Sequence, residues 1–162
     1  MARIRACEGV DGEGVPSSAV RCVSTLRVMT TTAAKILILG GMFNLLWGYA
    51  TGVVMAKVRT SAPETPKYLS LTHVVGLMWA PILLGLVLAV AVSDLTPWLE
   101  TAAAIAMVAA SVLLDGKDLL NWLQRVQDEF VTRPSGFGLG GLGAVMSTAG
   151  TVVLAAGVIR GL

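Results

Sequence analysis

His73 is the one histidine of this 162-residue chain, and it lies inside a long apolar stretch. An ionisable side chain within a membrane span is costly, which makes it a candidate for function. The imidazole could bridge two helices by a hydrogen bond, ligate haem or another metal, or relay a proton. Because the chain offers no second imidazole, haem bound to His73 would keep an open coordination position.

Asp115 ends the apolar part of a later stretch and is followed by Gly116, Lys117 and Asp118. One interpretation is a solvated helix end with an internal charge pair. The other is a carboxylate that orients a partner, such as the Nδ1–H of His73, because ligating imidazoles usually have an acceptor of this kind.

The helical neighbours of His73 indicate a surface for a ligand. Gly76 and Ala80 lie three and seven residues after it, on the same face of a helix. Small residues beside an imidazole would leave a shallow groove that could receive a flat macrocycle. Trp79 lies deeper in the stretch than interfacial tryptophans do and could form the wall of a pocket.

The composition places these residues in a membrane. Hydrophobic residues make up 55% of the chain and charged residues 14%, whereas soluble domains average about 45–50% and about 25%. A net charge of +2 with dispersed basic residues argues against a nucleic-acid partner. The two cysteines, Cys7 and Cys22, form neither a CxxC motif nor a disulfide framework.

Several apolar stretches are long enough to span a bilayer, because a helix of about 20 residues crosses a hydrocarbon core of ~30 Å. We predict an all-α four-transmembrane-helix bundle that forms a single domain over residues 33–160. Thr96 and Pro97 would begin the third helix as its N-cap and first-turn proline. The predicted helices span about 33–56, 69–92, 97–123 and 138–160.

Residues 1–32 are polar, and no apolar region of a signal peptide is found in them. We expect a disordered N-terminal extension, with Met29 as an alternative start of the chain. Basic residues divide six and six between the two sides of the membrane, so the positive-inside rule leaves the orientation open. A start at Met29 would leave two against six.

Small residues repeat every four positions on the last two predicted helices, which favours close helix packing and a homo-oligomer. The repeats are Ala102, Ala106 and Ala110, and Gly143, Ser147 and Thr151. The antiparallel order of the helices also brings His73, Asp115 and the glycine-dense segment 136–143 to the same half of the bilayer.

Three segments together resemble the styrene oxide isomerase family of small four-helix membrane enzymes, over roughly residues 36–159. A proline-containing loop leads into a helix with a histidine, in Pro63–His73. The third helix ends with Leu-Asp-Gly, in Val112–Gly116, and the fourth opens with a Phe-Gly-containing segment, Gly136–Gly140.

This resemblance implies a homotrimer with ferric haem b between protomers, in which His73 ligates the iron and Asp115 is a buried acid. The iron of the family acts as a Lewis acid on an epoxide oxygen, and the epoxide rearranges to an aldehyde. Trp79 stands where the family has its substrate-side asparagine, and Leu123 stands where it has a tyrosine. Asn121 and Trp122 are close to Leu123, so a small shift in helix phase could supply a substitute for the tyrosine.

We therefore expect an isomerase in a lipid bilayer, the bacterial inner (plasma) membrane, that acts on a small apolar substrate. The predicted haem site consists of His73, Gly76 and Ala80, and the predicted catalytic residues are Asp115, Trp79 and Asn121. Two alternatives stay open. One is a non-enzymatic haem protein, either a gas sensor or a haem carrier, and the other is a haem-free structural bundle.

Overall fold

The computed structural model describes residues 31–162, and this part of the chain is helical and contains no strand. The prediction of an all-α bundle is therefore confirmed. The predictions for the N-terminal extension and for Met29 lie outside the described residues. The helices are α2 (Thr32–Ser61), α3 (Lys67–Val92), α4 (Pro97–Leu123), α5 (Glu129–Thr132) and α6 (Phe137–Gly161).

The four long helices are each long and apolar enough to cross a membrane, so the chain is a multi-pass membrane protein. The predicted bounds are close for α3, α4 and α6. Helix α2 continues five residues beyond the predicted end at residue 56. This extension carries Lys57 and Arg59, and a helix can continue into the polar headgroup region after its apolar residues have ended.

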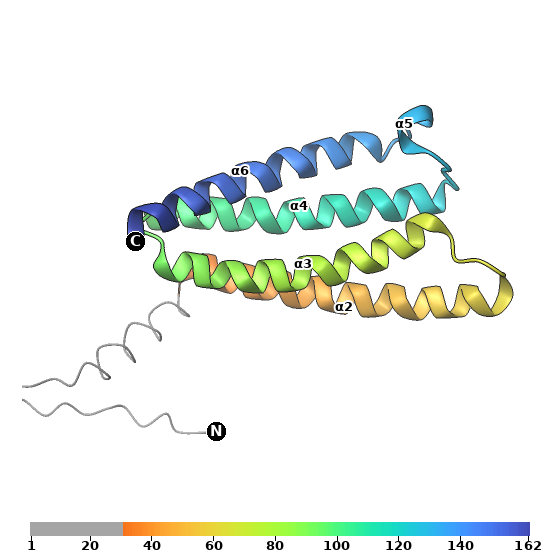
Figure 1. Cartoon of the computed structure of the whole chain (residues 1–162), viewed down its shortest axis with the longest axis horizontal. Helices are drawn as coiled ribbons and strands as arrows, with labels where there is room; N and C mark the ends of the chain where they lie inside the picture. The colour runs from red at the N-terminus through yellow and green to blue at the C-terminus, as the bar shows by residue number, and fades with distance from the viewer. Residues whose placement is uncertain (1–30) are drawn as a thin grey trace, which may run out of the picture.

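The long helices form two antiparallel pairs. Helix α2 packs chiefly on α3, and α4 packs chiefly on α6, so that two hairpins lie side by side (Figure 1). The loop between α2 and α3 and the connection from α4 through α5 to α6 lie at the same end of the bundle (Figure 1). We call this the α5 end. His73, Asp115 and the beginning of α6 all lie toward it.

Apolar and polar buried residues occupy different halves of the bundle. The hydrophobic core combines the beginning of α2, the end of α3, the beginning of α4 and Leu154 of α6, all far from the α5 end. In the half toward the α5 end, the buried side chains include seven polar ones: Asn44, Thr51, Thr72, Ser111, Asp115, Asp118 and Asn121. The polar half therefore contains most of the buried groups that could bind a ligand or take part in chemistry.

The predicted stripes of small residues are only partly buried. On α4, Ala110 is buried but Ala102 is exposed. On α6, the buried glycines are Gly143, Gly150 and Gly157, each seven residues after the last. At 3.6 residues per turn, a four-residue step drifts around the helix by about 40°, whereas a seven-residue step drifts by only about 20°. Gly143 and Gly150 therefore face α4, and Gly157 faces Ser93 and Leu95 in the loop that precedes α4.

Candidate functional site

The imidazole of His73 on α3 faces α2. Its Nδ1 lies 2.8 Å from the backbone carbonyl oxygen of Gly48. Because a carbonyl oxygen only accepts hydrogen bonds, Nδ1 carries the proton, and Nε2 of the neutral ring keeps its lone pair. Within residues 31–162 no hydrogen bond engages Nε2, and the side chain is half-buried. This nitrogen is free to ligate a metal.

Glycines on α2 make room for the ring. A Cβ at Gly52 would lie 2.9 Å from Cε1 and 3.1 Å from Nδ1 of His73, so the imidazole lies directly against the α2 backbone. A Cβ at Gly48 would lie 2.6 Å from Cδ2 of Leu77. Neither glycine is among the residues predicted from the sequence to form the site. Their signal is their four-residue spacing on the helix that precedes His73.

The groove expected along Gly76 and Ala80 is absent from the described residues, because α2 fills this face. A Cβ at Gly76 would lie 3.2 Å from Cδ1 of Trp47 and 3.4 Å from the backbone nitrogen of Gly48, and Ala80 is 1% exposed. Small residues in a membrane let helix backbones approach closely. Gly76 and Ala80 therefore bring α3 against α2, and within the described chain they face this helix.

His73 offers the one side-chain donor that a haem group would need. The pyrrole nitrogens of haem hold its iron, so the protein need supply only one imidazole nitrogen, and Nε2 of His73 is free. On α2, Tyr49 follows Gly48 and Val53 follows Gly52, and these two side chains are 59% and 58% exposed. Among the described residues, no three His, Cys, Asp or Glu side chains are grouped to hold a metal ion.

Asp115 does not orient His73. Its side chain is 3% exposed, and both carboxylate oxygens are buried without a hydrogen-bond partner among the described residues. The expected role as acceptor for Nδ1 belongs instead to the carbonyl of Gly48. The reason is helix packing, since His73 faces α2 and Asp115 lies on α4.

Other buried polar atoms in the same half of the bundle also lack partners. The amide nitrogen of Asn44 donates to Oγ of Ser111 at 3.0 Å and to the carbonyl oxygen of Gly40 at 2.8 Å, but Oδ1 of Asn44 accepts nothing from the described residues. The indole N–H of Trp47 is likewise buried and unpartnered there. Such groups usually find a bound water or a polar ligand.

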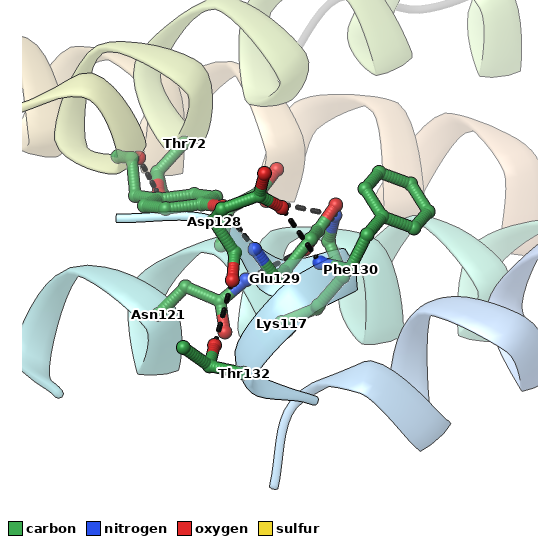
Figure 2. Close-up of polar contacts among 9 residues, drawn as sticks. Thr72, Lys117, Asn121, Asp128, Glu129, Phe130 and Thr132 are labelled. Carbon is green, nitrogen blue, oxygen red and sulfur yellow. Dashed lines mark hydrogen bonds and ion pairs between the residues drawn. The ribbon is translucent and has the colours of Figure 1, made fainter. Parts of the chain in front are cut away.

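A second polar cluster joins α5 to the bundle (Figure 2). Nζ of Lys117 lies 3.1 and 3.0 Å from the two carboxylate oxygens of Glu129 and 3.0 Å from Asp118. The amide nitrogen of Asn121 donates to Oε2 of Glu129 at 2.7 Å, and the backbone N–H of Glu129 donates to the hydroxyl of Tyr68 at 3.2 Å. Asn121 thus lies in this cluster and its amide nitrogen is already engaged.

Glycines at the start of α6 leave space for the side chain of Lys117 to reach Glu129. A Cβ at Gly140 would lie 2.6 Å from Cδ of Lys117, and a Cβ at Gly136 would lie 3.2 Å from the carbonyl oxygen of Lys117. Side chains at these positions would block the stem of the lysine. The sequence predicts this segment in the same half of the bilayer as His73 and Asp115, and in the structure Gly136 and Gly140 lie against Lys117.

Trp79 lies apart from both His73 and the Lys117–Glu129 pair. It lines a groove of about 370 Å³ whose other residues come from α3, α4 and α6, among them Met107 and Thr151. Among the predicted site residues, the structure thus separates His73, which faces α2, from Asp115 and Asn121 on α4 and from Trp79 in this groove.

No protein-family model, curated protein or solved structure matches the chain.

Proposed function

We propose that this protein is a haem b-binding membrane protein of the styrene oxide isomerase type, with Nε2 of His73 as the iron ligand. The hydrogen bond from Nδ1 of His73 to the carbonyl of Gly48 carries the proposal. Histidines that ligate metals usually donate their other ring N–H to such an acceptor, which fixes the tautomer and makes the ligating nitrogen more basic.

The proposed reaction is the isomerisation of a small apolar epoxide, such as an aryl epoxide, to an aldehyde. Ferric haem, when bound, would supply a Lewis acid for the epoxide oxygen. The chain itself would hold the ring of His73 between Gly48 and Gly52 and exclude water with the apolar side chains around it. Asp115 keeps its proposed role as a buried acid, and its burial without a partner supports this.

We further propose a homotrimer in a bacterial inner membrane. The face of α2 beside His73 exposes Tyr49 and Val53, and a second copy of the chain could cover a porphyrin there. Native mass spectrometry from mild detergent should give the mass of three chains with haem. A haem-loaded monomer would contradict this arrangement.

Absorption spectra of the detergent-purified protein, before and after dithionite, test haem binding. The wild type should show a Soret band that shifts on reduction and on addition of imidazole. His73→Asn is the sharpest variant, because its amide nitrogen can still donate to Gly48 but does not ligate haem iron well. The variant should fold and lose the Soret band. Full haem retention would overturn the assignment.

Isomerase activity is tested separately, by incubating the haem-loaded protein with phenyl-substituted epoxides and measuring the aldehyde. The expected result is aldehyde formation by the wild type and none by His73→Asn. Haem binding without any turnover would instead identify a gas sensor or a haem carrier. That outcome would agree with the engagement of the Asn121 amide by Glu129.

The second candidate is a haem-free structural bundle. The same bond between His73 and Gly48 favours it, because it ties α3 to α2 and could serve stability alone. In that case the wild type would be colourless, would take up no added haem, and His73→Leu would lower thermal stability without removing a chromophore.

A further inference from the structure

A cleft of about 710 Å³ opens at the α5 end, between the beginning of α3 and the end of α4. Its lining includes Lys67 and Tyr68 from α3, Trp122 from α4, and Arg125 from the connection that follows. Among its lining residues, Asn121 is also a predicted catalytic residue, and Glu129 engages its amide nitrogen. The proposed haem site does not involve this cleft. We call it the end cleft.

The end cleft lies at the level of lipid headgroups. Helix α3 has 26 residues, and at 1.5 Å per residue it is about 39 Å long, whereas a hydrocarbon core is ~30 Å thick. About one turn at each end therefore extends beyond the acyl chains. Lys67 is the first residue of α3 and Trp122 is the last but one of α4, so both lie in this interfacial layer.

The lining of the end cleft favours an anion. Lys67 and Arg125 form no ion pair with any described residue, and Lys67 Nζ lies 5.3 Å from the ring centre of Tyr68. The first turn of α3 contains no acidic residue and its N-cap makes no side-chain hydrogen bond. Glu64 is the acidic side chain of the lining, so two cations against one carboxylate leave a formal charge of +1.

The surroundings favour a lipid over a soluble anion. Leu123, which also lines the end cleft, is 63% exposed, so apolar surface continues from the cationic residues toward the acyl chains. Trp122 adds an aromatic ring, the side-chain type that anchors proteins at the headgroup level. A molecule with a phosphate group and acyl chains would contact both kinds of surface at once.

We propose that the end cleft binds the phosphate group of an anionic phospholipid, with Lys67 and Arg125 as the residues that hold it. A phospholipid headgroup and a soluble phosphate ester share the same recognition chemistry, which is an anionic phosphate close to two cations. This site is independent of the haem proposed at His73, which lies deeper in the bundle on the α2 side of α3.

Native mass spectrometry of the full chain in detergent, with phosphatidylglycerol added, tests the proposal. The double variant Lys67→Gln/Arg125→Gln should bind this lipid about thirtyfold more weakly, because each basic side chain near a lipid surface contributes about a fivefold factor. The matched control is Lys57→Gln/Arg59→Gln, which removes two charges at the same end but outside the cleft. The control should stay within about threefold of the wild type. An equal loss in both variants, or none in either, would overturn the site.

A competition experiment distinguishes the two sources of phosphate. Glycerol 3-phosphate in excess should leave the phosphatidylglycerol bound, because it cannot use the apolar surface near Leu123. If it displaces the lipid from the wild type, the end cleft is a site for soluble phosphate esters and the lipid assignment is wrong. Both substituted residues are exposed, so the variants should retain the fold.

Discussion

At the scale of single residues, glycine decides how His73 is held. Gly52 leaves space for the imidazole against α2, and a Cβ there would lie 2.9 Å from Cε1 of His73. We predict that Gly52→Ala displaces the ring from its bond to Gly48. The expected loss is about 1–3 kcal/mol, the usual effect of extra volume in a packed interface. Thermal unfolding in detergent, followed by circular dichroism, measures it.

Gly85→Ala is the matched control for this prediction. Gly85 lies on α3, and a Cβ at this position would meet nothing within 4 Å. The same chemical change should therefore leave stability unchanged or raise it by up to about 1 kcal/mol, since alanine favours helix more than glycine does. Equal unfolding temperatures for both variants would show that Gly52 does not confine His73.

Ser111 provides a second prediction at this scale. Its hydroxyl accepts the hydrogen bond from Asn44 at 3.0 Å and so links α2 and α4 inside the polar half. Ser111→Ala should cost about 0.5–1.5 kcal/mol, the range measured for hydrogen bonds between membrane helices. The control is Ser147→Ala, whose hydroxyl bonds only the carbonyl of Ala144 on its own helix. Unfolding in increasing denaturing detergent compares the two, and a larger loss for Ser147→Ala would contradict the prediction.

At the scale of elements, the sequence predicts the long helices well and α5 not at all. The apolar stretches that became α3 and α4 are long, and Pro97 marks the start of α4 as expected. By contrast, α5 has four residues, too few for a periodic pattern. Its position depends on Glu129 meeting Lys117, twelve residues away. Such a contact follows from the packing of α4 against α6, and the local sequence does not determine this packing.

We predict that the Lys117–Glu129 pair keeps α5 closed on the bundle. Glu129→Gln preserves the shape of the side chain but removes its charge, and Lys117 keeps only Asp118 as an ionic partner. The pair is largely shielded, with 16% exposure on each side chain, so a loss of about 1 kcal/mol is expected. That energy corresponds to an equilibrium constant for opening that is about fivefold larger.

Hydrogen–deuterium exchange of residues 126–135 measures this opening. The expected increase should be confined to this segment, with unchanged exchange in the middle of the long helices. Glu64→Gln is the control, because Glu64 is an exposed carboxylate at the same end and makes no ion pair with the described residues. Similar exchange in both variants would mean that Glu129 does not hold α5.

At the scale of the whole molecule, polarity changes along the bundle axis. The predicted gathering of His73, Asp115 and the start of α6 toward the same end agrees with the structure, because antiparallel order follows directly from short loops. Whether these residues contact one another could not be predicted in this way. Which neighbour a side chain meets depends on the rotation of each helix. Here His73 faces α2, while Asp115 on α4 has no hydrogen-bond partner within residues 31–162.

The same antiparallel order gives a topology that labelling can test. Residues 61 and 135 lie in exposed positions at the α5 end, and residues 94 and 162 lie in exposed positions at the other end. In a background where Cys7 and Cys22 are replaced by serine, we predict that Ser61→Cys and Ser135→Cys react with a membrane-impermeant maleimide from one side of sealed vesicles. Asp94→Cys and Leu162→Cys should react from the opposite side.

The assignment of either pair to the cytoplasm follows from the vesicle orientation. If Ser61→Cys and Ser135→Cys label from different sides, the number of crossings between them is odd, and α3 and α4 cannot both span the bilayer.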